Sequence, residues 1–455
     1  MKTSILFLLL ALCTTSLIAQ TQTIRGTVTD SDSEFPLFGA TIMVVGIDPI
    51  IGAATDIDGR FVLEKVPVGR VDLRISAIGY ETTFRTNIMV FTGKESVVNV
   101  ALTEQITQMD EVVVTPGKSP TEVNNEFAAV SAQTFDMELS GRFAGSRNDP
   151  ARMATNFAGV SGANDARNDI IIRGNSPAGV LWRLEGIDIP SPNHFSSFGS
   201  TGGPVSMLNN NVLAQSDFMT AAFPAEYGNA LAGVFDLGMR NGNNSTRELT
   251  AQMGFNGFEF GAEGPISNKS AASYLVNYRY STLSVFDQLG FDLGTGTGIP
   301  YFQDVNYKIN LPTKNAGVFA VWGLAGNSSI DILGSELDLE SETNLYGGEG
   351  EDIYVRSQTA VTGISHTYFL DKKTYSKLSI AYTYQNEGNE IDSVSVLDRS
   401  IQTPYQSINN EQQKWSAHWR VNRKINAKNT INAGIIAESM RVNMQDSVLV
   451  GNRWI

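Results

Sequence analysis

The second half of the chain alternates apolar and polar residues along several long stretches. Apolar and aromatic side chains occupy every second position, with mostly polar ones between them, in residues 272–281, 305–311, 378–385 and 415–422. A period of two is that of a β-strand, in which successive side chains point to opposite faces. An apolar face rich in aromatic residues, opposite a polar face, is typical of the lipid side and the lumen side of a membrane barrel. We therefore predict the first part of an antiparallel transmembrane β-barrel over residues 241–455.

A single alternating segment would be ambiguous, because the strands of a soluble antiparallel sheet alternate too. The series of such segments carries the prediction, and about nine strands are expected by residue 455. A plugged transporter barrel has about 22 strands. We therefore expect that this sequence is a truncated one that stops inside the barrel, rather than a chain that forms a pore by itself.

Residues 20–104 show a run of short strands instead of long alternating ones. Strand-forming residues cluster in residues 23–29, 40–45, 60–64 and 70–75, and turn residues such as Pro36, Gly59 and Gly69 lie between the clusters. About seven strands in roughly eighty residues predict a small β-sandwich.

This N-terminal segment resembles the carboxypeptidase-regulatory-like domain, which is a transthyretin-like sandwich. The resemblance rests on Gly26-Thr27-Val28, Pro36-Leu37 with Gly39-Ala40, Val45-Gly46, Thr55-Asp56 with Asp58-Gly59, and Ile78-Gly79-Tyr80. It implies a non-catalytic accessory domain with a carbohydrate-binding-like fold. Asp56 and Asp58 also fit the opening of a calcium loop, but the remaining ligands of an EF-hand are missing. A hairpin turn is therefore the stronger interpretation.

Residues 1–19 have the pattern of a secretory signal peptide. Lys2 supplies the positive charge, residues 5–12 form the apolar stretch, and cleavage is predicted between Ala19 and Gln20. The apolar stretch is too short to span a bilayer as a helix. Cys13 is the only cysteine of the chain, so the mature protein has neither a thiol nor a disulfide. We expect an exported protein.

A short isolated strand is predicted inside a polar linker, residues 105–123. Its residues are Met109, Asp110, Glu111, Val112, Val113, Val114, Thr115 and Pro116. Three valines between a charged start and a proline stop give a strand edge that is suited to pairing with a partner by β-augmentation. A last strand of the preceding sandwich is the alternative on pattern alone. The stretch resembles a TonB box, and the resemblance implies the periplasmic domain of TonB as its partner.

Residues 124–240 mix short helical and strand patterns with many glycines and asparagines. Asp149 before Pro150 marks the start of a helix. In order and spacing the region resembles the plug domain of TonB-dependent receptors. The residues that carry this resemblance are Ile172, Arg173, Gly174, Arg183, Glu185 and Gly186, with Tyr227-Gly228 in the exit segment.

This chain differs from the usual pattern of the plug-domain family in two places. Many family members have a valine-rich strand ending in Asp-Gly where this chain has Trp182-Arg183-Leu184-Glu185-Gly186. The valine-rich box followed by Gly-Tyr-Gly, which the polysaccharide-importing SusC-like branch favours, is absent as well. A SusD-type lipoprotein partner and a glycan cargo are therefore not favoured, although that branch of the family has them.

Charged residues in a plug inside a lumen need charged partners, because an unpaired buried charge is costly. The residues concerned are Arg173, Arg183 and Glu185. We expect that Glu259 and Glu263, on the first strands of the barrel, supply partners from the inner face.

Composition and motifs exclude several classes of function. A formal net charge of −14 gives no electrostatic footprint for binding nucleic acid. The three histidines, His194, His366 and His418, lack the close spacing of a metal site. Motifs of hydrolases, metalloproteases and phosphate loops do not occur. We predict no enzymatic activity, and no catalytic residue, metal or cofactor.

One stretch between the predicted strands is strongly acidic. Residues 328–354 contain no basic residue and eight acidic ones: Asp331, Glu336, Asp338, Glu340, Glu342, Glu349, Glu351 and Asp352. The simplest interpretation is a solvated external loop. The alternative is a loop that attracts cations or a cationic ligand.

The sequence thus predicts a mainly β protein with a small β-sandwich, an α+β plug domain and the first part of a barrel. The family resemblance implies a receptor and transporter that lies in outer-membrane lipid and takes up an extracellular ligand of unknown identity. The energy for uptake would arrive through TonB. The rival is a non-transporting outer-membrane protein that binds, senses or adheres through its β-sandwich and external loops.

The predicted leader can be tested directly. Because the charged and apolar start ends at Ala19-Gln20, the mature protein should begin near Gln20 and be recovered with the outer membrane. N-terminal sequencing of the fractionated protein measures this. A chain found in the cytoplasm with Met1 intact would contradict the prediction.

Overall fold

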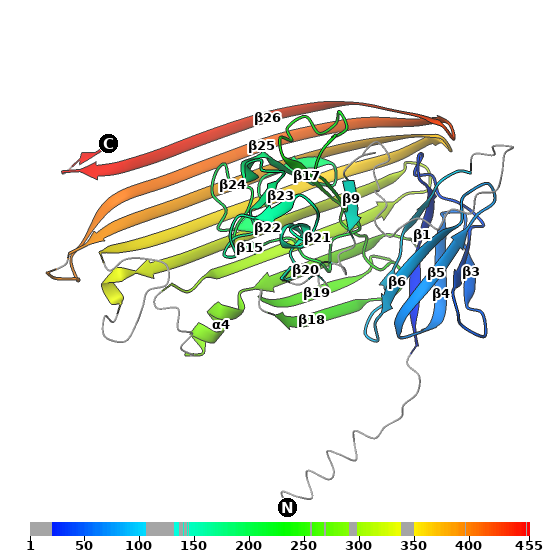
Figure 1. Cartoon of the computed structure of the whole chain (residues 1–455), viewed down its shortest axis with the longest axis horizontal. Coiled ribbons are helices and arrows are strands. Elements are labelled where there is room, and N and C mark those ends of the chain that lie inside the picture. Colours follow the sequence, from blue (N-terminus) through cyan, green and yellow to red (C-terminus); the bar gives the residue numbers. More distant parts are fainter. Residues whose placement is uncertain are drawn as a thin grey trace, which may run out of the picture. The chain divides into compact units, whose positions relative to one another are not determined.

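The computed structural model describes residues 21–105, 132–135, 140, 143, 145–254, 257–267, 270–290, 298–337, 350–395, 397–451 and 453–455. The predicted cleavage point at Ala19-Gln20 and the segment from Met109 to Pro116 lie outside these residues. The chain is mainly β, as the sequence predicts (Figure 1). It divides into two compact units, Met1–Glu122 with Arg423–Ile431, and Val123–Asn422 with Asn432–Ile455.

The β-sandwich of the first unit is built from two sheets. One has the order β4-β1-β7, with β8 also paired to β1, and the other has the order β3-β2-β5-β6. The strands are β1 (Thr21–Asp30), β2 (Thr41–Val44), β3 (Gly52–Ala54), β4 (Arg60–Pro67), β5 (Gly69–Ser76), β6 (Thr83–Val90), β7 (Ser96–Val97) and β8 (Val100–Leu102). Alternate residues of β1, such as Ile24 and Val28, are buried with Ile42 and Leu73 in one apolar core. The predicted sandwich is confirmed.

The turn from Asp56 to Gly59 is tight, but the predicted hairpin is wrong, because the turn joins β3 and β4, which belong to different sheets of the sandwich. Asp56 Oδ1 accepts hydrogen bonds from the backbone N–H groups of Asp58 at 2.9 Å and Arg60 at 2.8 Å. Gly59 has a φ of 70°, and a Cβ at this position would lie 2.5 Å from the carbonyl oxygen of Val28. The turn therefore requires glycine, and the Asp56 side chain closes it.

The plug, residues 132–240, contains a mixed sheet with the order β13-β12-β17-β16-β9. Its strands are β9 (Ala132–Phe135), β12 (Val180–Leu184), β13 (Ile187–Ile189), β16 (Ser216–Met219) and β17 (Gly233–Leu237). Around it lie α3 (Pro150–Ala154), η1 (Pro177–Gly179) and two strand pairs, β10 (Val160–Gly162) with β11 (Ile170–Ile172) and β14 (Asn193–His194) with β15 (Val205–Ser206). Asp149 caps α3 as predicted, because its side chain accepts from the backbone of Ala151.

Aromatic rings fill the core of the plug. Phe235 lies at the centre, with its ring centroid 4.3 Å from that of Trp182 and 4.5 Å from that of Phe218. Phe135 adds an edge-on contact at 6.3 Å. All four rings are buried. Burial of their apolar area and the contacts between the rings stabilise the packing of these strands.

The rest of the second unit is a ten-stranded antiparallel sheet in which each strand pairs with the next along the chain. Its strands are β18 (Glu248–Gly254), β19 (Gly257–Pro265), β20 (Ser273–Tyr280), β21 (Tyr301–Pro312), β22 (Val318–Leu333), β23 (Glu351–Asp371), β24 (Thr374–Val394), β25 (Gln402–Asn426), β26 (Asn429–Val450) and β27 (Arg453–Trp454). Two short helices, α4 (Thr282–Gln288) and η2 (Gly334–Glu336), follow β20 and β22. Within the described ranges, the helices are all too short and too polar to cross a membrane.

The plug lies against one face of this sheet, where β13 contacts β24 and β14 contacts β22 and β23 (Figure 1). We call this the inner face. Burial along the strands is inverted relative to a soluble sheet. On β24 the inner residues Ser379 and Thr383 are buried, whereas Leu378 and Ile380 on the outer face are exposed by 37% and 45%. The predicted alternation is thus confirmed, with the polar side turned toward the plug.

We predict that Phe235→Ala destabilises the plug by about 3–5 kcal/mol, because it removes a central ring and leaves a cavity. The measurement is urea unfolding of the detergent-solubilised protein, followed by the near-ultraviolet circular dichroism of Trp182 and its neighbours. Phe84→Ala is the control, because this ring is partly exposed on the sandwich and its loss should have little effect. An unfolding midpoint for Phe235→Ala equal to that of the parent protein would contradict the assigned core.

Candidate functional site

The two glycine motifs that the sequence singles out form the same local structure. Arg173 and Gly174 have φ values of 50° and 80°, and Glu185 and Gly186 have values of 52° and 86°. Arg173 and Gly174 lie between Ile172 and Asn175, which form an antiparallel β-bridge. Glu185 and Gly186 join β12 to β13, which pair as antiparallel strands. Two successive residues with positive φ are what a type I′ hairpin turn needs, and glycine fits its second position.

Glu185 anchors the β12–β13 turn to the inner face of the sheet. Lys308 of β21 donates to Glu185 Oε1 at 2.7 Å, and the same oxygen accepts from the backbone N–H of Met239 at 2.8 Å. Lys308 also donates to the carbonyl oxygen of Met239 at 2.6 Å. Burial alone would raise the pKa of Glu185, but Lys308, Lys377 and these hydrogen bonds outweigh it and lower the pKa. Glu185 is therefore a buried carboxylate that stays ionised.

Arg183 lies two residues before this turn and is buried among plug carboxylates. Its Nε lies 3.4 Å from Asp188 Oδ1, its Nη1 lies 3.4 Å from Glu226 Oε2, and its guanidinium covers the Tyr227 ring at 4.7 Å. Burial opposes the charge of Arg183, but Asp236, Asp188 and Glu226 outweigh that effect and raise its pKa. Arg183 therefore stays charged and holds the plug strands and the exit segment together.

A third buried group joins the plug to β20 and β21. His194 Nε2 lies 3.0 Å from Asp304 Oδ2, and Arg279 Nε donates to the same oxygen at 2.8 Å. All three side chains are buried. Burial lowers the pKa of His194, and Asp304 only partly offsets this effect, so the ring is neutral at pH 7. A neutral His194 is consistent with this site, because Arg279 already neutralises the negative charge of Asp304.

The expected partners of the plug charges were wrong. Glu263 binds Arg240, whose two terminal nitrogens donate to its two oxygens at 2.7 and 2.6 Å. Glu259 accepts from the side chains of Asn209 and Asn211. Both glutamates therefore do hold the plug, but through other residues than Arg183 and Glu185. Arg173 is exposed and donates to Thr220 Oγ1 at 3.4 Å, so it needs no partner from the sheet.

Sequence reasoning missed Lys308 and Asp304 as partners of the plug, and missed Arg240 as the plug residue that binds Glu263. Lys308 and Asp304 are charged residues at inner positions of a predicted barrel strand, which is the signal that marks them. Their partners come from segments about 70 to 120 residues away, as with Lys308 and Glu185 (123 residues). No local pattern identifies such pairs.

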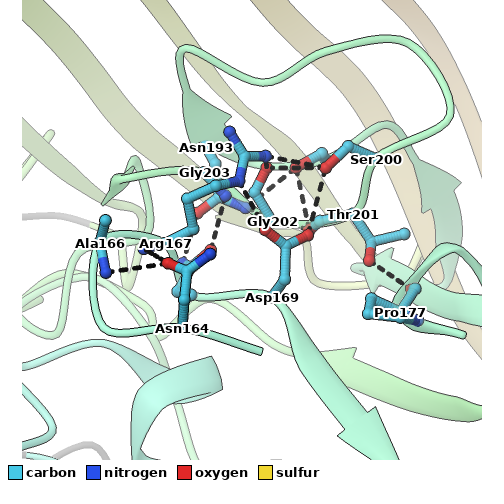
Figure 2. Close-up of polar contacts among 12 residues, drawn as sticks. Asn164, Ala166, Arg167, Asp169, Pro177, Asn193, Ser200, Thr201, Gly202 and Gly203 are labelled. Atoms are coloured by element: carbon cyan, nitrogen blue, oxygen red, sulfur yellow. Dashed lines mark hydrogen bonds and ion pairs between the residues drawn. The ribbon is translucent and has the colours of Figure 1, made fainter. Parts of the chain in front are cut away.

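A separate polar cluster braces two loops of the plug (Figure 2). Arg167 donates through Nε to Asp169 at 2.7 Å, and through Nη2 to Ser200 Oγ and the carbonyl oxygen of Gly202, both at 2.9 Å. Asn164 Oδ1 accepts from the backbone N–H of Arg167 at 3.0 Å. A Cβ on Gly202 would lie 2.5 Å from the Asp169 side chain, so this close approach requires glycine. The cluster fixes the loop that precedes β15.

The structure brings together most of the predicted plug residues but not all the predicted site residues. Ile172 is buried in the plug core, Glu185 contacts Lys308 of β21, and Arg183 Nη2 lies 3.4 Å from Nδ1 of His418 on β25. The described parts of the chain contain no group of three or more His, Cys, Asp or Glu residues that could hold a metal ion. The segment from Met109 to Pro116 has no described geometry and stays a sequence prediction.

The N-terminal residues have a recognisable relative. Residues 24–114 match the family described as CarboxypepD_reg-like domain. The predicted resemblance of this segment is confirmed. The match runs beyond β8 to Val114 and so includes the three valines of the predicted TonB box. A search of curated proteins finds no match to the chain.

Several solved structures are similar to part of this chain. The pyoverdine outer membrane receptor FpvA of Pseudomonas aeruginosa is 11% identical, with a TM-score of 0.42 over 60% of this chain and 41% of that one. The copper transporter OprC is 10% identical, with a TM-score of 0.44 over 70% and 46%. A cohesin–X-dockerin complex of Acetivibrio cellulolyticus is 21% identical, with a TM-score of 0.15 over 17% and 52%. The chain thus spans about half of the length of these proteins.

We predict that Lys308→Met loosens the plug by about 3–5 kcal/mol, because it leaves Glu185 as a buried charge without its cation. Lys308→Met combined with Glu185→Met should recover much of this loss, since the pair is then replaced by apolar groups of similar size. The measurement is the denaturant midpoint for release of the plug, read by limited proteolysis.

The pH dependence gives an independent check of the same pair. The pKa of Glu185 is lowered in the folded protein. The ionised carboxylate therefore contributes fully to the stability of the plug at a pH above the pKa of the unfolded chain, about 4.3. This stabilisation is lost as the pH falls through the lower pKa of the folded protein. The parent protein should therefore lose plug stability below about pH 4, and the double variant should lose less. Equal acid sensitivity of the two proteins would contradict the assignment.

Proposed function

We propose that the chain belongs to a TonB-dependent receptor of the outer membrane that takes up an extracellular ligand. The observation that carries the proposal is the inverted burial of the ten-stranded sheet. Large apolar side chains of the outer face, such as Ile364 and Trp415, are exposed by 56% and 59%. Contiguous apolar surface of this kind is unfavourable in water and marks contact with a membrane or a partner. Hydrocarbon around a barrel is the environment that fits it.

The apolar surface forms a band that covers only part of each strand. On β24 the outer residues Leu378, Ile380, Tyr382 and Tyr384 are followed by Asn386 and Glu390. Four successive outer positions span roughly 20 Å along a strand, which is close to the roughly 25 Å apolar band of outer-membrane barrels. β22 repeats the pattern, with Phe319 and Val321 before Asn327 and Asp331. The band supports a membrane position with the ends of β22 and β24 outside the lipid.

The proposed coupling to TonB enters the plug at its edge strand. The valine segment around Val113 precedes β9, and β9 pairs only with β16 in the described sheet. A TonB domain that adds a strand to this segment would therefore load the plug at β9. Glu185–Lys308 and Arg240–Glu263 hold other parts of the plug to the wall. In this scheme no nucleotide is consumed in the outer membrane, and the energy comes from the inner membrane.

The coupling segment is the part of the proposal that substitution tests most sharply. Strand addition draws its affinity from main-chain hydrogen bonds, so Val113→Pro removes a donor, fixes φ and should abolish energised uptake. Val113→Ala keeps the ladder and should retain much of the uptake. The measurement compares energised uptake and surface binding of ligand in the full-length receptor.

Surface binding is the control, because neither variant touches the extracellular side. The proposal requires Val113→Pro to bind ligand normally while it fails to transport. Uptake that survives Val113→Pro would show that this segment is not the TonB box. Intact binding with no energised uptake in the parent protein would instead favour the non-transporting alternative.

A further inference from the structure

The first compact unit includes a short segment from far along the chain. Residues Arg423–Ile431 belong to this unit together with the sandwich, whereas the residues before and after them belong to the second unit. The segment contains the end of β25, the start of β26 and the turn between them. The sandwich is therefore connected to the rest of the chain in two ways. One connection is the linker that follows Glu104, and the other is the set of contacts that hold Arg423–Ile431.

Lys424 makes the main contacts of this segment with the sandwich. Its Nζ lies 2.6 Å from Asp30 Oδ2 and 2.9 Å from Asp32 Oδ2. The same atom lies 3.1 Å from Glu104 Oε2 and 6.0 Å from the centre of the Tyr80 ring. Lys424 is only 3% exposed, so these partners replace the water that its charge has lost. An ammonium has three donors, and a carboxylate lies within reach of each. We call these five residues the lysine clamp.

The sandwich side of the lysine clamp is held in place by bonds that do not involve Lys424. Asp30 Oδ1 accepts from the backbone N–H of Asp32 at 3.0 Å. Asp30 Oδ2 accepts from the hydroxyl of Tyr80 at 2.9 Å. Tyr80 and Glu104 form a β-bridge through their backbones. Loss of the ammonium should therefore open the lysine clamp without unfolding the sandwich.

The lysine clamp lies at the start of the linker that contains the predicted coupling segment. Glu104 is a member of the clamp, and the segment begins at Met109. Residues 105–108 connect the two and reach at most roughly 14 Å when extended. Residues 117–131 connect Pro116 to β9 and reach up to roughly 50 Å. A pull on the coupling segment therefore tightens the sandwich side before the plug side.

We propose that the lysine clamp carries the first load when the coupling segment is pulled, and that it opens before the plug moves. The clamp resists as one unit, because displacement of a single ammonium breaks its contacts with all three carboxylates together. While the clamp is closed, a weak pull ends at the sandwich and does not reach β9. Once it is open, the sandwich follows the linker and the load passes to the plug. This inference rests on the proposed function, because it takes the segment around Val113 as the point of attachment.

The test is single-molecule force spectroscopy on the full-length receptor in lipid nanodiscs fixed to a surface. The handle is attached at Val113→Cys, so that the pull does not depend on binding of TonB. Cys13 is the only other cysteine of residues 1–455, and it lies in the predicted leader. We expect a first force peak at short extension and a second peak when the plug gives way. Lys424→Met should remove the first peak and keep the second. Lys428→Met is the matched control and should keep both, because Lys428 is an exposed lysine of the same segment.

Amide hydrogen exchange measures the same contact without force. Lys424→Met should make exchange in Arg423–Ile431 at least about tenfold faster, because the segment is no longer held, while exchange in β5 stays as in the parent protein. Asp32→Asn is a milder variant that removes one of the three negative charges and nearly preserves the side-chain size. It should lower the first force peak without abolishing it, which tests the clamp even if Lys424→Met perturbs the sandwich.

Three results would overturn the proposal. They are a first peak that survives Lys424→Met, a parent protein that shows no first peak, and exchange in Arg423–Ile431 that Lys424→Met leaves unchanged. Energised uptake separates this inference from the proposed function. Uptake that Val113→Pro abolishes, in a receptor without a first force peak, would leave the proposed function standing and remove only the role of the lysine clamp.

Discussion

Charge buried on the inner face of the ten-stranded sheet is the constraint on which the second unit depends. Lys308, Asp304 and Glu263 are all nearly inaccessible to water, and each is held by a residue of the plug or by a neighbouring strand. Removing one partner would leave a charge that neither water nor another group compensates. The plug is therefore specified by polar pairing with the wall, while its own strands are held by an aromatic core.

The period-two pattern was sufficient to predict the sheet, because alternation is a local property of a strand. Leu378 and Ser379 show the predicted division between outer and inner faces. Turn chemistry was sufficient to locate the turn at Asp56 and Gly59, but not to show that it joins two different sheets. The pairing between plug and wall could not be predicted in the same way. Glu263 was expected to serve Arg173 or Arg183, but it binds Arg240, because the register between two separate sheets depends on the whole packing.

The two turn motifs show how similar sequence signals acquire different roles. Arg173-Gly174 and Glu185-Gly186 have the same backbone conformation, and glycine permits it in both. Arg173 remains exposed, whereas Glu185 is buried against Lys308. The sequence indicated both turns and could not distinguish a solvent-facing charge from an anchoring one, since that difference arises only when the wall is in place.

The length of the strands has a consequence for how the protein can vary. β23 and β24 each have 21 residues, whereas about 9–11 residues are enough for a strand to cross a bilayer. About half of each strand therefore stands clear of the proposed lipid band, and its position is fixed by main-chain hydrogen bonds that do not depend on side-chain identity. Substitutions in the part that stands clear can therefore change the surface that the strands present without moving their backbone, because the ladder and not the side chains holds the wall in register.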